Sequence, residues 1–397
     1  SDRKFDLFRE AIELAEAQLG PEHASVVERR CELARALIVG GEVDAARALI
    51  AQAGAAVEAT NDPASRFHWL RTRARLHLHD ARWTDALTDY EAALAIEGLP
   101  QSGWAGFQRR MTMQAMLGTA AQNGETDRAL DASKQLIDYM ESLLGPDHSQ
   151  LVVAYSNRGT LLRMSGDHDS AEAPYRRSLE LARATRTPPD ADLATCLNNL
   201  GALYRYQRKR DPAVELLTEA SEMYVALYGE NHRSVAAALD NIADVHRDHG
   251  DYAAALPIQR RSLAILRATL GDAHYETLCG FFRTARLEVR AGTIESARAM
   301  WRTSFASLES LNRRSQDRVL HFAGDVRKAF AELGPQSPRV EFLLALAHAL
   351  QTTARLDPAE AALREALATA KASELRPGVA AAIETFNRAT GRSITPR

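Results

Sequence analysis

The chain has 397 residues, with 49 lysines and arginines against 52 aspartates and glutamates, which gives a formal net charge of −3. A charge this close to neutral argues against a dedicated nucleic-acid-binding protein, which usually carries a clear basic excess. Ala, Leu, Arg and Glu dominate and all favour helices, so an all-α fold is predicted. Cys31, Cys196 and Cys279 are dispersed, which predicts small core residues in a reducing compartment and not a disulfide or zinc framework.

The predicted helices come in pairs along the chain. Residues 1–19 are predicted to form the lone helix of a partial repeat, followed over 24–142 by irregular hairpins at 24–60, 64–98 and 104–142. Regular 42-residue repeats are predicted over 148–312, with hairpins at 148–184, 190–227, 232–269 and 274–312. An inserted helix at 315–333 precedes a final hairpin and cap over 338–391, with the hairpin at 338–372 and the capping helix at 377–391. We therefore expect a single solenoid domain over 1–397 with about eight hairpins in tandem.

The repeats are marked by one alanine that follows a short turn. It recurs as Ala46, Ala86, Ala129, Ala171, Ala213, Ala255, Ala297 and Ala359. A small residue precedes most of these alanines by 12 positions, as Ala34, Ala74, Gly159, Gly201, Ala243 and Ala285. Small residues in the first helix, here called helix A, allow the second, helix B, to approach closely. Each repeat is thus predicted to be helix A, a tight glycine turn and helix B.

A second marker joins each helix B to the next helix A. It occurs as Gly20-Pro21-Glu22-His23, Gly145-Pro146-Asp147-His148, Gly229-Glu230-Asn231-His232 and Gly271-Asp272-Ala273-His274. Glycine just past a helix end is typical of a C-terminal cap, and proline prevents the helix from continuing. The Asp or Asn of the linker is predicted to cap the next helix. The histidines are predicted to be loop or capping residues instead of metal ligands.

These motifs resemble a known family. Leu197-Asn198-Asn199-Leu200-Gly201-Ala202-Leu203-Tyr204 and Leu239-Asp240-Asn241-Ile242-Ala243, together with the Gly-Pro-Asp-His linkers, are similar to the tetratricopeptide repeat in its 42-residue, kinesin-light-chain form. The resemblance implies an all-α, right-handed superhelical solenoid whose helix A lines the concave wall. It also implies a protein–protein interaction scaffold that binds an acidic linear motif.

Two columns of polar residues are predicted to face that wall. One holds Asn157, Asn199 and Asn241 followed by Arg283, and the other holds Arg163, Arg205 and Arg247, with Arg286, Arg290, Asn198 and Tyr206 close by. Guanidinium groups are planar forks of donors that suit carboxylates. Asn side chains can pair with both the N–H and the C=O of an extended backbone. The columns predict a groove that binds an acidic extended peptide or helix.

The same residues have a structural interpretation. Asp240, Asp244 and Asp248 are also predicted to face inward, and Asp244–Arg286 and Asp248–Arg290 pairs between repeats would neutralise the charge. Exposed pairs of this kind contribute only about 0–1 kcal/mol to stability. The Asn column is equally consistent with a structural ladder between neighbouring A helices. Both interpretations of the two columns stay open on the sequence alone.

The sequence offers little support for other functions. It contains no GxxxxGK, GxSxG or HExxH motif, so no enzyme activity and no cofactor are predicted. His68 and His79 are too far apart on one helix to share a metal ion, and Cys279 has no His and Asp arranged beside it. RNA binding through the Arg column is an alternative that the net charge disfavours. No apolar run reaches the about 18 residues of a membrane-spanning helix.

Two hypotheses follow for function. The first is a cytoplasmic scaffold that binds a protein or peptide of acidic character in its groove. The second is the regulatory or sensor arm of a bacterial multidomain signalling enzyme, a kinase or protease whose catalytic domain is absent from this chain. The second is motivated by the abrupt start of the chain inside a helical pattern. The sequence indicates no oligomeric state.

Overall fold

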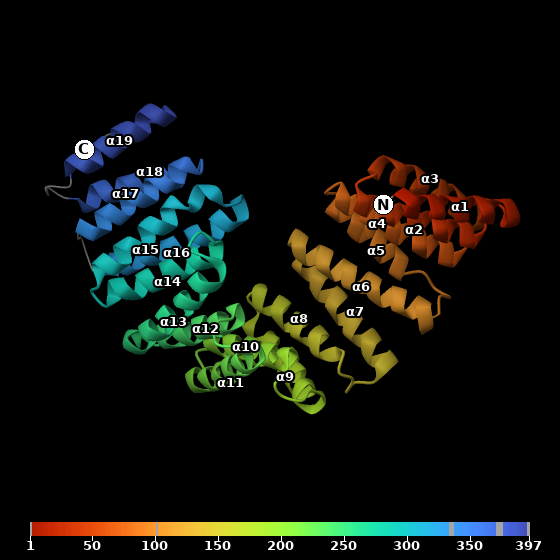
Figure 1. The fold of residues 1–397 in the computed structure, drawn as a ribbon, viewed down its shortest axis with the longest axis horizontal. Helices are drawn as coiled ribbons and strands as arrows, with labels where there is room; N and C mark the ends of the chain where they lie inside the picture. Colours follow the sequence, from red (N-terminus) through yellow and green to blue (C-terminus); the bar gives the residue numbers. More distant parts are fainter. Residues whose placement is uncertain (1, 101, 333–336, 371–375, 395–397) are drawn as a thin grey trace. The chain divides into compact units, whose positions relative to one another are not determined.

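A computed structural model describes residues 2–100, 102–332, 337–370 and 376–394 of the chain. This described part is helical and contains no strand, which confirms the all-α prediction. The helices follow one another as hairpins in tandem (Figure 1). They fall into two compact units, residues 1–186 and 187–397, each described here by itself.

Unit 1 (residues 1–186) is coloured from red to yellow-green in Figure 1. Its helices are α1 (Asp2–Leu19), α2 (Ala24–Gly40), α3 (Val43–Thr60), α4 (Pro63–His79), α5 (Trp83–Leu94), α6 (Gly103–Asn123), α7 (Thr126–Leu144), α8 (Leu151–Met164) and α9 (His168–Thr185). Helix α2 contacts α3, α4 contacts α5, α6 contacts α7 and α8 contacts α9, so each pair is one hairpin. Contacts such as those between α2 and α4 stack successive A helices.

Unit 2 (residues 187–397) continues the pattern in green to blue. Its helices are α10 (Ala191–Tyr206), α11 (Arg210–Tyr228), α12 (Arg233–Asp248), α13 (Tyr252–Leu270), α14 (Tyr275–Arg290), α15 (Ile294–Ala306), α16 (Arg313–Glu332), α17 (Ser337–Thr352), α18 (Leu356–Thr369) and α19 (Arg376–Thr390). A short 3₁₀ helix, Leu308–Ser310, precedes α16. Part of the linker between α18 and α19, and with it the end of the hairpin predicted at 338–372, lies outside the described residues.

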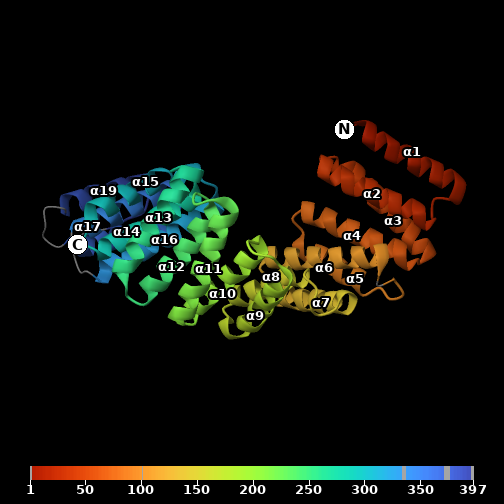
Figure 2. The same cartoon turned by 60° about the horizontal axis from the view of Figure 1, so that its bottom comes forward.

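Helix α16 packs beside α14, as Figure 2 also shows. It therefore extends the wall that α12 and α14 begin, while α15 packs against α14 and contacts α17. The core behind it is aromatic. The Trp301 ring meets those of Phe330 and Phe342 edge-on, with centroids 5.6 and 5.4 Å apart, and all three side chains are buried. This core holds α16 in a fixed place against the repeats.

The small residues of the A helices permit close approach, as predicted. A Cβ atom added at Gly201 would lie 2.7 Å from Cγ of Leu217 in α11. One added at Gly159 would lie 2.7 Å from the Tyr175 ring in α9. Real Cβ atoms do not come so close to neighbouring atoms, so the A and B helices of these two hairpins can reach their observed packing only with glycine.

The glycine turns between helices A and B are also confirmed. Gly250 has a φ of +79°, in the left-handed region that favours glycine. The next N–H, that of Asp251, donates to the carbonyl of His246 at 2.9 Å and closes the end of α12. Asp251 then caps α13 through its side chain, which accepts from the Ala254 N–H.

The histidines of the linkers cap helices, as predicted, but the Asp and Asn beside them do not. His23, His232 and His274 are the N-cap residues of α2, α12 and α14, and each side chain accepts a hydrogen bond from the N–H two residues later. His148 makes the equivalent bond to the Gln150 N–H at 3.2 Å. The prediction that Asp or Asn would cap these helices is therefore wrong. The imidazole Nδ1 reaches the free N–H groups of the first turn in their place.

Candidate functional site

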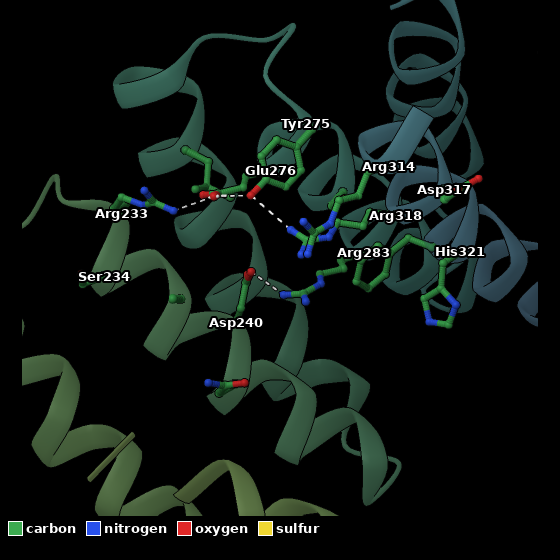
Figure 3. A pocket seen from close by; sticks show the side chains of 15 residues that line it. Arg233, Ser234, Asp240, Tyr275, Glu276, Arg283, Arg314, Asp317, Arg318 and His321 are labelled. Carbon is green, nitrogen blue, oxygen red and sulfur yellow. Dashed lines mark hydrogen bonds and ion pairs between the residues drawn. The ribbon is translucent and has the colours of Figure 1, made fainter. Parts of the chain in front are cut away.

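Helices α12, α14 and α16 of unit 2 enclose a groove of about 1020 Å³. Figure 3 shows the side chains that point into it from these three helices. Its charged and polar lining includes Arg233, Asp240, Asn241, Tyr275, Glu276, Arg283, Arg314, Asp317, Arg318 and His321. The A helices of the sixth and seventh predicted hairpins, α12 and α14, thus combine with the inserted helix α16 to form one site.

Two carboxylates of the groove are already engaged by neighbouring donors. Glu276 accepts from Arg233 at 2.7 Å and from the Tyr275 hydroxyl at 2.9 Å (Figure 3). Asp240 pairs with Arg283 and also accepts from Gln259 and Ser262, each at 2.6 Å. Both carboxylates are therefore already paired with an arginine of the groove.

The first half of α16 brings in positive charge that is not matched. Arg314 has no hydrogen-bond or ion-pair partner in the described part of the chain, and Arg318 donates only to the Tyr275 hydroxyl, at 3.4 Å. The carboxylate between them, Asp317, is held by Arg355 at 2.5 Å. Both arginines are exposed, and Figure 3 shows both side chains at the groove. The groove therefore carries two arginines that are available to an anion.

The floor of the groove includes Cys279, for which the sequence offered no His and Asp that could activate a nucleophile. Burial raises the pKa of its thiol to about 12, although Arg283 lowers it slightly. At neutral pH the side chain is therefore a protonated thiol, which is a poor nucleophile. The site offers cations and hydrogen-bond donors, and these groups can hold an anionic ligand.

Of the residues predicted to bind a ligand, Asn241 and Arg283 line this groove. Asn241 donates to the side-chain oxygen of Asn198 in α10 at 3.1 Å, a contact between neighbouring A helices. Arg283 also lies over the Phe322 ring of α16, 4.6 Å from its centroid. Both residues are therefore held in place from two helices.

The predicted arginine column of unit 2 is largely neutralised. Arg205 lies 2.5 Å from Asp244 and 3.7 Å from Asp248, both on the next A helix. Arg247 pairs with the same two aspartates. Burial lowers the pKa of Arg247 to about 10, and the neighbouring Arg286 contributes to that lowering. These contacts support the structural interpretation of the column.

The remaining predicted residues of unit 2 lie around these pairs. Arg286 is 3.6 Å from Asp244, which confirms the Asp244–Arg286 pair, and 3.0 Å from Asp325 of α16. Arg290 lies over the Tyr252 ring at 5.2 Å, and Tyr206 lies under the Arg205 guanidinium at 4.5 Å. Asn199 lies in α10 beside Asn198.

Asn157 and Arg163 belong to unit 1, on α8, so they are described apart from the columns of unit 2. Asn157 lines an apolar groove of about 690 Å³ between α6 and α8, where Val153 and Met164 are exposed. Whether Arg163 continues the line of Arg205 and Arg247 stays a prediction from the repeat spacing.

Two arginines of the groove, Arg314 and Arg318, were not among the residues predicted to bind a ligand. They lie outside the 42-residue rhythm, so alignment on the repeat could not reach them. Their signal was the spacing of four residues, which places both on one helical face, with His321 three residues further on.

No group of three His, Cys, Asp or Glu side chains that could hold a metal ion occurs among the described residues. None of the helices in the described ranges combines the length and apolar character needed to cross a membrane.

Tandem helical hairpins with small residues at their crossings define a class of helical-repeat scaffolds. A sequence model of the tetratricopeptide repeat family matches residues 111–184, 175–226, 192–268 and 234–310, which together span half of the chain. The chain belongs to the tetratricopeptide repeat family.

Solved structures with a similar fold come from several proteins of low sequence identity. A kinesin-light-chain protein of Podospora anserina with nearly identical repeats is 17% identical, with a TM-score of 0.46 over 51% of this chain and 95% of that one. A tetratricopeptide repeat protein from Parabacteroides merdae is 14% identical, with a TM-score of 0.49 over 75% and 98%. A Rap protein in complex with competence and sporulation factor is 14% identical, with a TM-score of 0.49 over 92% and 98%.

Proposed function

We propose that this tetratricopeptide repeat scaffold binds an acidic segment of a partner protein in the groove between α12, α14 and α16. The observation that carries the proposal is the unmatched pair Arg314 and Arg318 on the wall opposite α12. Two adjacent guanidinium groups can each bind a carboxylate through two parallel hydrogen bonds. A segment with two acidic residues close together fits this arrangement.

Other lining groups suit the backbone and side chains of such a segment. The amide of Asn241 faces the groove and can pair with a peptide group. The Phe322 and Tyr275 rings border the arginines and offer apolar surface beside the charge. The site therefore favours an acidic peptide with an apolar residue near its carboxylates over a small inorganic anion.

In this proposal, most arginines of the predicted column have a structural role and do not bind the ligand. Arg205, Arg247 and Arg286 hold the A helices in register through Asp244, so they fix the shape of the wall without contacting the ligand. Asn241 and Arg283 remain as proposed contacts from the set predicted by sequence. Asn157 and Arg163 remain proposed contacts of unit 1 only.

The test compares two charge-matched double variants of the full chain. Arg314→Gln with Arg318→Gln removes both unmatched charges of the groove. Arg261→Gln with Arg302→Gln removes two exposed arginines of the B helices α13 and α15, which have only long contacts to acids. The probe is a fluorescent peptide of alternating Glu and Leu residues, with a Gln and Leu peptide as the uncharged reference.

Loss of two charge-assisted contacts should weaken binding of the acidic peptide at least about tenfold in the groove variant, because a factor of ten corresponds to about 1.4 kcal/mol. The control variant should bind like the parent. Equal affinity of the two variants, or equal binding of the charged and uncharged peptides to the parent, would refute the proposal.

A further inference from the structure

Unit 1 contains a second cluster of arginines, which lines a cavity of its own. Helices α2, α4 and α6 surround a cavity of about 460 Å³. Arg35 of α2 and Arg71 and Arg75 of α4 line it, together with the Tyr90 ring of α5. The described lining contains no aspartate or glutamate.

The three guanidinium groups have few partners of their own. Arg71 donates to the side-chain oxygen of Gln108 and lies over the Phe67 ring at 5.2 Å. Arg35 and Arg75 make no hydrogen bond or ion pair to any described residue. Among the described residues, the three guanidinium groups therefore make one hydrogen bond, and its acceptor is neutral.

Two carboxylates of the surrounding helices lie beside groups outside the cavity lining. Asp89, next to Tyr90 in sequence, accepts two hydrogen bonds from Arg73, at 2.5 and 2.8 Å, and lies 3.4 Å from His77. Glu28 lies 3.7 Å from His68. Neither is part of the cavity lining. The described lining therefore supplies no carboxylate to balance the positive charge of the cavity.

The inward arginines of this cavity differ from Arg205 of unit 2 in lacking a carboxylate on the next A helix. In unit 2 the inward arginine Arg205 meets Asp244 from the next A helix. In unit 1 the next A helix, α6, supplies Gln114 and Gly118 to the cavity of Arg71 and Arg75. The repeat architecture is the same, but the neutralising carboxylate is missing.

The absence of a counter-charge matters most for Arg71, which is largely buried. Burial lowers the pKa of Arg71 to about 10, and Arg35 and Arg75 lower it further. A buried charge without a partner is unfavourable, and an anion bound beside it would relieve that penalty. Burial also raises the pKa of Tyr90, so its hydroxyl remains a hydrogen-bond donor at neutral pH.

We propose that this cavity is an anion site for a phosphomonoester group, built by Arg35, Arg71, Arg75 and the Tyr90 hydroxyl. A phosphomonoester carries a charge of about −1.5 to −2 at neutral pH and presents three acceptor oxygens. Three guanidinium groups can serve those oxygens at once, whereas a carboxylate has one charge and two oxygens. The site is independent of the acidic-peptide groove, since it shares no residue and no unit with it.

The group could arrive on a phosphorylated protein segment or as a free phosphate compound, and the probes separate these sources. The full chain is titrated calorimetrically with inorganic phosphate and with a neutral peptide that carries one phosphoserine. The same peptide with glutamate in place of phosphoserine tests a carboxylate in the same context. A peptide that binds at least about tenfold more tightly than inorganic phosphate identifies a protein segment as the source, and equal affinities identify a free phosphate compound.

The variants are Arg75→Gln and, as the matched control, Arg66→Gln. Both arginines are exposed on α4 and neither has a side-chain partner among the described residues, so neither change should disturb folding. Only Arg75 lines the cavity. Arg75→Gln should weaken binding of the phosphorylated probe about tenfold or more, the effect expected for one charge-assisted contact, while Arg66→Gln should leave it unchanged.

A pH series adds a readout that depends on the second ionisation of the phosphate group. Because the second pKa of a phosphomonoester is about 6, affinity for the phosphoserine peptide should rise between about pH 5.5 and 7.5. The glutamate peptide is fully charged throughout that interval and should show no such rise. Equal affinity for the two peptides, or an Arg75→Gln variant that binds like the parent, would overturn the proposal.

Discussion

The Arg205 guanidinium in α10 lies 2.5 Å from the carboxylate of Asp244, on the next A helix of the repeat. The pair is shielded from water, since the two side chains retain 11% and 9% of their exposed surface. Asp244 also pairs with Arg247 and lies 3.6 Å from Arg286. One carboxylate thus joins arginines from three successive A helices.

Removing that carboxylate should destabilise unit 2 severely. Asp244→Ala leaves three arginines close together without their shared acceptor, and loss of one partner from a buried ion pair costs about 3–5 kcal/mol. We expect a decrease of that size in the free energy of unfolding, measured by urea denaturation followed by circular dichroism. Glu215→Ala, at an exposed position of α11 with no side-chain partner among the described residues, is the control and should change stability by less than about 0.5 kcal/mol.

Substitution of one arginine tests whether the shared carboxylate contributes more to stability than a single arginine does. Arg205→Ala leaves Asp244 with Arg247 and Arg286, so its loss of stability should be clearly smaller than that of Asp244→Ala. Equal losses would mean that the Arg205 contact alone accounts for the effect, contrary to the shared arrangement described above.

The repeat itself was predictable because close helix packing places a strict demand on a few positions. Gly201 and Ala213 recur at fixed spacing since no larger side chain fits where helices A and B cross. Charge pairing within the wall was predictable in part. The Asp244–Arg286 contact follows from matching rows on neighbouring helices, whereas the additional contact of Arg205 with Asp244 depends on side-chain reach.

Less of the candidate site than of the repeat could be predicted from the sequence. Arg314 and Arg318 lie on an inserted helix, and its packing against α14 depends on an aromatic core whose members are far apart in sequence. The cavity of Arg35 and Arg75 is defined by the absence of a carboxylate on α6. Missing partners can be recognised only when the facing residues of several helices are known.

Two glycine substitutions in unit 1, one at the crossing of α8 and α9 and one inside α6, should have opposite effects on stability. Gly159→Ala would place a Cβ atom 2.7 Å from the Tyr175 ring, and overpacking of this kind destabilises by about 1–3 kcal/mol. Gly118→Ala, inside α6 with nothing within 4 Å, should instead stabilise by up to about 1 kcal/mol, the helix preference of alanine over glycine. Thermal unfolding of both variants checks the opposite signs, and a shift in the same direction would contradict the packing.

The linker histidines predict a capping effect at the start of α2. The His23 side chain accepts from the Ser25 N–H at 3.2 Å, so His23→Ala should lose about 0.5–2 kcal/mol of stability. His23→Asn keeps a side-chain acceptor at the N-cap and should retain most of that stability. Chemical denaturation of the parent and the two variants measures the three free energies of unfolding to be compared. If His23→Ala and His23→Asn are equally stable, the histidine does not act as a cap.

Unit 1 should lose stability in mild acid because His68 is largely buried. Burial, followed by Arg71 and Arg35, lowers the pKa of His68 to about 4, while Asp62 opposes the shift weakly. In the unfolded chain a histidine has a pKa of about 6.5, so between about pH 6.5 and 4 the unfolded state binds more protons than the folded one. Stability from the neutral imidazole is therefore complete above about pH 6.5 and declines as the pH falls towards 4, by at most about 3 kcal/mol.

Tryptophan fluorescence is a suitable measurement, because Trp69, Trp83 and Trp104 lie in unit 1 and only Trp301 lies in unit 2. Urea unfolding is followed at intervals from pH 7.5 to 4.5 for the parent and for His68→Gln. The difference in stability between parent and variant should be constant above about pH 7 and shrink as the pH falls. His79→Gln, an exposed change on the same helix that keeps His68, should retain the acid-dependent decline of the parent. A decline that persists unaltered in His68→Gln would assign the acid sensitivity of unit 1 to other groups.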